Sequence, residues 1–188
     1  MHPFFARGFC IVACALVPLL SLAGSNRTDR IEVRQGNELV RVSAGTGEAV
    51  GEGSYDVRVY DVTNGADLVF LDGLVVSRDG DLAQAWYCDL NGDEQPELAV
   101  WTVSAGSGSS GQFDLFAWRE GRLEQVETPE PAKSWLRGYQ GHDTYSVEHG
   151  AILRTFPVYQ GKDTRSAPTG GRRTLVLICE KERWMWRL

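Results

Sequence analysis

The sequence has little that would attract a nucleic acid or an anionic membrane, because basic residues are in the minority. Its 188 residues include 19 Lys and Arg against 25 Asp and Glu, a formal net charge of −6 at pH 7. An acidic chain repels phosphate-rich partners and favours a basic one. The alternative is that this charge only keeps a small domain soluble. We therefore predict no nucleic-acid partner and leave a basic protein partner open.

Long apolar runs are also lacking, apart from one near the N-terminus. Residues 1–23 place Arg7 ahead of the run "FCIVACALVPLLSLA", which ends in small residues and is typical of a cleaved export signal. The run is shorter than a transmembrane helix needs. We predict export with no membrane attachment after cleavage. A lipid anchor at Cys14, in "IVAC", is the less favoured alternative because too little apolar sequence precedes it.

Cysteine is scarce as well. Of four cysteines, only Cys88 and Cys179 lie beyond the predicted signal. In an oxidising compartment such a pair is a candidate disulfide. Each also lies in an apolar, strand-like run, so two unbridged core thiols are an equal alternative.

The sequence also lacks helical periodicity. From Tyr55 onward apolar and polar residues alternate, and Asn-Gly, Asp-Gly and Glu-Gly turns separate the runs, a pattern typical of antiparallel strands. We predict one all-β domain over residues 55–188, a sandwich or barrel, preceded at residues 24–54 by a loosely attached arm with one strand. Only residues 131–139 suggest a short helix.

The loop "TVSAGSGSSGQF" carries three glycines in the order of a dinucleotide-binding turn. That turn requires a following helix to hold the phosphates, whereas "QFDLFAWRE" alternates like a strand. We interpret the loop as a hairpin tip rich in hydroxyls and backbone donors, able to enter a narrow cleft. The alternative is a functionless flexible linker. The candidate binding residues are Ser104, Gly106, Ser107, Gly108, Ser109, Ser110 and Gly111.

A second polar loop, "DLNGDEQPEL", spaces oxygen-bearing side chains as a calcium loop does. The candidate ligands are Asp89, Asn91, Asp93 and Glu97. Hard cations prefer such oxygens, and the spacing resembles the calcium loops of FG-GAP propeller repeats. However, only one copy is present and Val100 replaces the last ligand of an EF-hand. The alternative is a hairpin turn with solvated carboxylates.

Catalytic motifs are absent. A Ser-His-Asp hydrolase is one comparison, with His142, Asp143 and His149 beside the loop serines, but no G-x-S-x-G motif occurs. The same histidines do not have the spacing of zinc ligands. We interpret the histidines as surface residues beside a turn. The sequence therefore does not predict an enzyme.

Three stretches together resemble one family, the periplasmic inhibitors of invertebrate-type lysozyme. They are "DGLVVSRDG", "DLNGDEQPELAVWTVSAGSGS" and "ILRTFPVYQGKDTRSAPTGGRR". The resemblance implies an antiparallel β-sandwich of about eight strands, a periplasmic location and lysozyme as partner. The resemblance also implies that a Ser-Gly loop, followed by Tyr, projects into the lysozyme cleft. Separately, we expect no cofactor, with calcium as the alternative, and leave a homodimer open. Here the matching residues are Ser107 and Gly108, while Ser110 occupies the Tyr position and Phe113 is the nearest aromatic residue.

Two hypotheses follow. The first is a lysozyme inhibitor that inserts residues 104–111 into the cleft of the enzyme. The second is a calcium-dependent binding or structural module built around residues 89–97.

Overall fold

The computed structural model describes residues 29–188, except residues 49–50, 64, 66, 105 and 107. This part of the chain forms twelve β-strands and contains no helix, so the predicted all-β class is confirmed. Accordingly, no helix among the described residues is long and apolar enough to span a membrane. The predicted signal, residues 1–23, lies outside the described residues.

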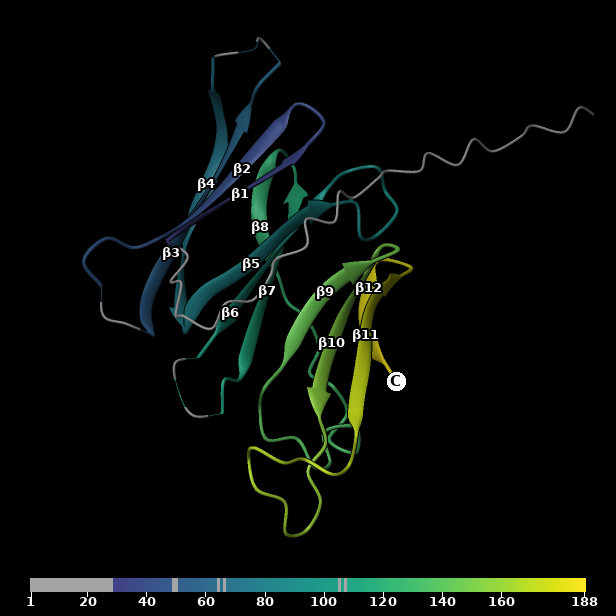
Figure 1. Ribbon diagram of the computed structural model, residues 1–188. Helices are drawn as coiled ribbons and strands as arrows, with labels where there is room; N and C mark the ends of the chain where they lie inside the picture. Colours follow the sequence, from purple (N-terminus) through teal and green to yellow (C-terminus); the bar gives the residue numbers. More distant parts are fainter. Residues whose placement is uncertain (1–28, 49–50, 64, 66, 105, 107) are drawn as a thin grey trace, which may run out of the picture.

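The strands form three successive antiparallel meanders of four strands each (Figure 1). The first sheet consists of β1 (Arg30–Gln35), β2 (Glu38–Ala44), β3 (Glu52–Asp61) and β4 (Val69–Asp79). The second consists of β5 (Asp81–Cys88), β6 (Glu97–Val103), β7 (Gly111–Arg119) and β8 (Arg122–Val126). The third consists of β9 (Thr144–Glu148), β10 (Ala151–Pro157), β11 (Arg172–Glu180) and β12 (Arg183–Arg187). Twelve strands in three sheets exceed the eight-stranded sandwich that the resemblance implied.

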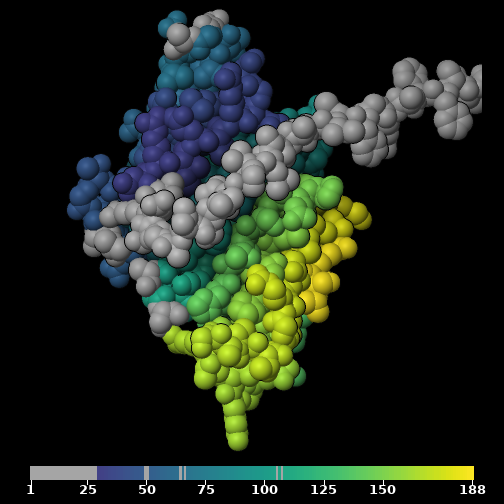
Figure 2. All heavy atoms as spheres, viewed as in Figure 1, coloured from purple at the N-terminus to yellow at the C-terminus, as the bar shows by residue number. Residues whose placement is uncertain are grey.

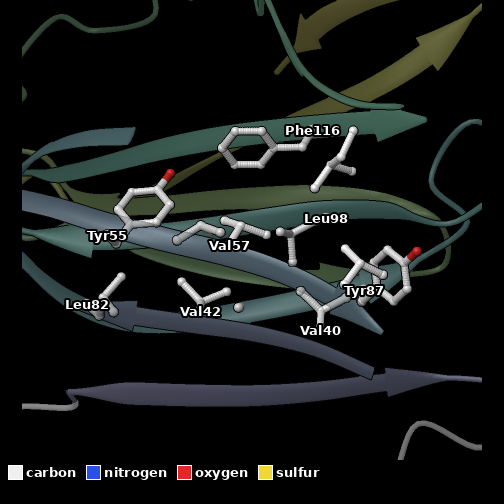
Figure 3. Close-up of a cluster of buried hydrophobic side chains, with 12 residues drawn as sticks. Val40, Val42, Tyr55, Val57, Leu82, Tyr87, Leu98 and Phe116 are labelled. Carbon is white, nitrogen blue, oxygen red and sulfur yellow. The ribbon is translucent and has the colours of Figure 1, made fainter. Parts of the chain in front are cut away.

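The second sheet is the middle layer. One of its faces packs against the first sheet, where the core includes Val40, Val57, Leu82, Leu98 and Phe116 (Figure 3). Its other face packs against the third sheet through Ala99, Leu115, Tyr145, Ile152 and Leu177. The space-filling view shows the purple and blue first sheet separated from the green and yellow third sheet, with teal atoms between them (Figure 2).

Strand β6 shows the consequence of this central position. Four consecutive residues, Glu97 to Val100, are all buried. A strand with one solvated face alternates between apolar and polar residues, whereas one covered on both faces has a continuous apolar run. Residues 98–101, "LAVW", are such a run, and this run is the local signal of a three-layered arrangement.

The described residues of the predicted arm, 29–48 and 51–54, are more ordered than expected. They contain two complete strands and the start of β3, and both Val40 and Val42 are fully buried. These two residues pair across the sheet with Val59 and Val57. Such cross-strand apolar pairs stabilise a sheet, so the segment belongs to the first core.

The helix predicted at residues 131–139 is not formed. The segment is a series of turns with i to i+3 bonds, such as the Trp135 N–H donating to the Ala132 carbonyl at 2.8 Å. The side chain of Arg173 on β11 donates to the carbonyls of Trp135 and Arg137. Tertiary hydrogen bonds thus hold the carbonyls of this turn segment in place of a helical ladder.

Candidate functional site

The Ser/Gly-rich loop connects β6 to β7 and projects beyond the ends of both strands (Figure 1). The loop is closed at its mouth, where the Ser104 N–H donates to the Ser110 carbonyl at 3.0 Å and the two hydroxyls lie 3.1 Å apart. At the tip, the Ser109 N–H donates to the Gly106 carbonyl at 2.9 Å. The loop is therefore a hairpin tip, as predicted, and no helix follows it.

Exposure is uneven along the loop. Gly106 and Ser110 are exposed, while Ser104, Gly108 and Ser109 are half-buried. Ser107, which the resemblance aligns with the inhibitory serine, lies outside the described residues. The loop therefore presents Ser110 and backbone at Gly106 to solvent, while its Gly108 side contacts the rest of the molecule.

Two glycines outside the loop allow other backbone segments to approach it closely. A Cβ atom on Gly80, in the turn between β4 and β5, would lie 2.4 Å from the Val103 carbonyl oxygen. A Cβ atom on Gly141 would lie 1.9 Å from the Gly108 carbonyl oxygen. Both glycines have φ angles in the left-handed region, +117° and +96°, which disfavours other residues. The same Gly108 carbonyl accepts the His142 N–H at 2.8 Å.

The acidic loop at the other end of β6 has a different organisation. The Asp89 carboxylate accepts the N–H groups of Gly92 and Glu94, at 2.6 Å and 3.1 Å. Glu97 accepts the Leu90 N–H at 2.7 Å and the Asn91 side-chain amide at 2.6 Å. Among the described residues, no group of three or more His, Cys, Asp or Glu side chains is placed to hold a metal ion. The carboxylates thus accept hydrogen bonds from amides of the loop itself, and the calcium hypothesis gains no geometric support.

Glu97 is the unusual member of this loop because it is only 1% exposed. Burial, with smaller contributions from the carboxylates of Asp93 and Asp89, raises the pKa of Glu97 from 4.5 to about 7. The hydrogen bond from Leu90 partly offsets this rise in pKa. The charge of the Glu97 carboxyl group is therefore sensitive to pH near neutrality.

The residues considered for a hydrolase do not form a triad in the described part of the chain. His149 is exposed in the turn between β9 and β10, and His142 contacts the loop through its backbone. Asp143, in contrast, is buried and forms an ion pair with Arg154, with Nε and Oδ1 separated by 2.7 Å. Sequence analysis missed Arg154, which is brought to Asp143 by the pairing of β9 with β10.

Cys88 and Cys179 are half-buried thiols that no disulfide joins. Burial raises the pKa of Cys179. This agrees with the alternative of two unbridged thiols in the core.

Strand β4 lies at the edge of the first sheet and exposes apolar side chains. The most exposed are Val69, Phe70 and Val75, with Val75 72% exposed. An edge strand of this kind is able to pair with another chain. The sequence leaves a homodimer open, and β4 is a surface on which it can be tested.

Comparison with known proteins identifies the family. The family described as periplasmic lysozyme inhibitor of I-type lysozyme matches residues 25–134, which include both loops. The chain belongs to this family. The members of this inhibitor family act on lysozyme as inhibitors and are not enzymes, and their described location is the periplasm.

Solved structures from the inhibitor family are similar in sequence. The crystal structure of PliI-Ah, the periplasmic lysozyme inhibitor of I-type lysozyme from Aeromonas hydrophila, is 40% identical, covering 51% of this chain and 83% of that chain, with a TM-score of 0.45. The A. hydrophila PliI in complex with Meretrix lusoria lysozyme is 45% identical, covering 48% and 74%, with a TM-score of 0.43. No curated protein matches the chain.

Proposed function

We propose that this chain inhibits I-type lysozyme by inserting the loop of residues 104–111 into the active-site cleft of the enzyme. The observation that carries the proposal is the position of this loop, a projecting hairpin tip inside the family-matched residues 25–134. A related inhibitor from A. hydrophila has been crystallised in complex with a lysozyme from Meretrix lusoria.

The chemistry of the loop suits a lysozyme cleft. Lysozyme hydrolyses its substrate with a carboxylic acid and a carboxylate on opposite sides of the scissile bond. A serine hydroxyl can donate to one of these groups and accept from the other. Backbone N–H groups in the glycine-rich loop supply further donors to ionised carboxylates, and such charge-assisted bonds are strong. Occupying both groups prevents hydrolysis without any reaction on the inhibitor.

The loop also meets the steric demand of a narrow cleft. Gly106 and Gly108 have no side chains, and the described serines add only hydroxymethyl groups. Its mouth is held by the hydrogen bond between Ser104 and Ser110, so less conformational entropy is lost on binding than with an open loop. The net charge of −6 favours encounter with a basic enzyme.

The test is a titration of the mature protein against I-type, chicken-type and goose-type lysozymes in a cell-wall lysis assay. We expect inhibition of the I-type enzyme at micromolar concentration or below, and a Ser107→Ala variant that inhibits at least tenfold more weakly. Ser166→Ala, in the exposed loop between β10 and β11, is the matched control and retains inhibition. Failure to inhibit any lysozyme rejects the function, and an equally active Ser107→Ala variant rejects the mechanism.

The calcium hypothesis from the sequence has no support in the described geometry, and a thermal melt tests it independently. A ligand that binds only the folded state raises the melting temperature. A rise in millimolar calcium that a chelator reverses would support calcium binding at residues 89–97, and an unchanged melting temperature would reject it.

A further inference from the structure

The contacts beneath the loop come largely from a part of the chain outside the family-matched residues 25–134. Residues 139–154, which lead into β9 and end within β10, pack against the Gly108 side of the loop and against Gly111, the first residue of β7. The third sheet therefore contributes directly to the surroundings of the proposed inhibitory loop.

Asp143 is the centre of these contacts. Its carboxylate has no exposed surface. Oδ2 accepts the Gly111 N–H at 3.0 Å and also the Tyr139 hydroxyl, while Oδ1 accepts from Arg154 Nε at 2.7 Å. One buried carboxylate thus joins the end of the loop to two elements distant in the sequence.

Arg154 is held in turn by aromatic rings. Its guanidinium carbon lies 4.9 Å from the ring centroid of Tyr139 and 5.7 Å from that of Phe156. The side chain of Arg154 is 11% exposed. A buried ion pair offsets its desolvation only when the remaining hydrogen-bonding capacity is used, and removing one partner leaves an uncompensated charge. The pair therefore restricts Asp143 to one position.

Rings from two sheets close the space around Gly111. A Cβ atom on Gly111 would lie 2.8 Å from both the Trp101 indole nitrogen and Tyr145 Cε2. Tyr145 also stacks on Phe113, with centroids 5.6 Å apart and an interplanar angle of 14°. Gly111, at the β7 end of the loop, therefore lies against aromatic rings from both the second and the third sheet.

We propose that Asp143 and Arg154 are positioning residues, which hold the loop of residues 104–111 in the conformation that enters the lysozyme cleft. The proposal rests on the proposed function. When only a fraction of molecules has the competent conformation, the apparent dissociation constant rises by the inverse of that fraction. We call the Asp143–Arg154 pair the anchor of the loop. Loss of the anchor lowers the fraction of molecules whose loop has the competent conformation, and it removes no atom of the loop itself.

The experiment compares Asp143→Asn and Arg154→Met with a matched control, Asp114→Asn, in the full mature chain. Like Asp143, Asp114 is a buried aspartate that accepts a tyrosine hydroxyl, in this case from Tyr55 at 2.7 Å. Asp114 lies on β7, however, and this hydrogen bond joins it to β3 of the first sheet. All variants are measured at a temperature where circular dichroism shows them folded. Arg154→Lys, which keeps the charge, should restore part of the wild-type behaviour.

Two readouts are needed. The first is hydrogen exchange of the Gly111 and His142 amides in the free protein, which we expect to be at least tenfold faster in both anchor variants and unchanged in Asp114→Asn. The second is the kinetics of binding to I-type lysozyme. We expect the association rate constant to fall at least fivefold, with the dissociation rate constant changing less than twofold.

Wild-type exchange rates in Asp143→Asn would overturn the anchor, whether or not the protein inhibits lysozyme. Faster exchange with unchanged association kinetics would overturn the positioning role. If the wild-type protein binds no lysozyme, the proposed function fails, and the exchange measurement alone still decides whether the anchor holds the loop.

Discussion

The two loops at the ends of β6 are both polar and both look functional in the sequence, yet the structure organises them in opposite ways. In the loop before β6, the side chains of Asp89 and Glu97 accept hydrogen bonds from the loop's own amides. In the loop after β6, Gly108 and Gly111 are held through backbone atoms by residues outside the loop. The first loop is held by its own carboxylates, whereas the second combines backbone bonds of its own with support from His142 and Asp143 outside the loop.

This difference indicates where a partner can bind. A loop whose acceptors are saturated by its own donors has little left to offer a ligand without first losing those bonds. A loop supported from outside can keep part of its surface in solvent, as Gly106 at its tip and Ser110 at its mouth are exposed. Four predictions test whether this division of roles is correct.

The largest expected effect is on stability, at the acidic loop. Glu97→Ala removes the acceptor of the Leu90 N–H and leaves a cavity at a fully enclosed site. We expect the free energy of unfolding in urea to fall by about 3 kcal/mol. Asp93→Ala, at an exposed neighbour, should cost less than about 1 kcal/mol. Equal losses would show that burial of Glu97 does not matter.

The pH dependence of stability is the next effect in size. Because the pKa of Glu97 is about 7 in the folded protein against 4.5 for an unperturbed group, the folded state binds more protons than the unfolded state between these values. Stability therefore falls as pH rises through this window. We expect a loss of about 1–2 kcal/mol between pH 5.5 and pH 8 in chelator-containing buffer.

Glu97→Gln is the control for this measurement. The amide does not titrate, so the variant should have a flatter dependence of its unfolding free energy over the same range. A wild-type protein that is more stable at pH 8 than at pH 5.5 would contradict the raised pKa.

Much of the fold could be predicted because its signals are local. The alternation in "YDVRVYD" and the Glu120-Gly121 turn, with φ angles of +52° and +78°, each specify their own segment. "RIEVRQ" alternates equally well, with Ile31 and Val33 packed against the first core, so β1 could have been predicted from the same rule.

The bond between Asp143 and the loop and the stacking of the three sheets could not be predicted from local sequence patterns. Asp143 meets Gly111 across 32 positions of the chain, and the contact depends on how the third sheet packs on the second. No short-range pattern records such packing. The continuous apolar run of β6 signals that both faces are covered, but it does not say by which strands.

A smaller effect is expected from restoring the family's aromatic residue in the loop. Ser110 is exposed, so a ring at this position has room beside the mouth of the loop. We expect Ser110→Tyr to lower the inhibition constant about fivefold, since aromatic contacts contribute about 1 kcal/mol beyond area burial. Ser110→Phe separates the ring from its hydroxyl. An unchanged constant for both variants would place Ser110 outside the interface.

The smallest effects should come from surface charges, and they should differ between the two ends of β6. The seven residues of β6 separate the loops by about 20 Å, which is more than twice the screening length of about 8 Å at physiological ionic strength. At physiological ionic strength, neutralising Asp93 and Glu94 together should therefore leave the association rate constant with lysozyme unchanged. Asp79→Asn acts next to Gly80, which contacts the base of the inhibitory loop, and should lower that rate constant about twofold at low salt. Stopped-flow measurements at two ionic strengths check both. A larger effect from Asp93 and Glu94 than from Asp79 would mean that lysozyme approaches the opposite end of the molecule.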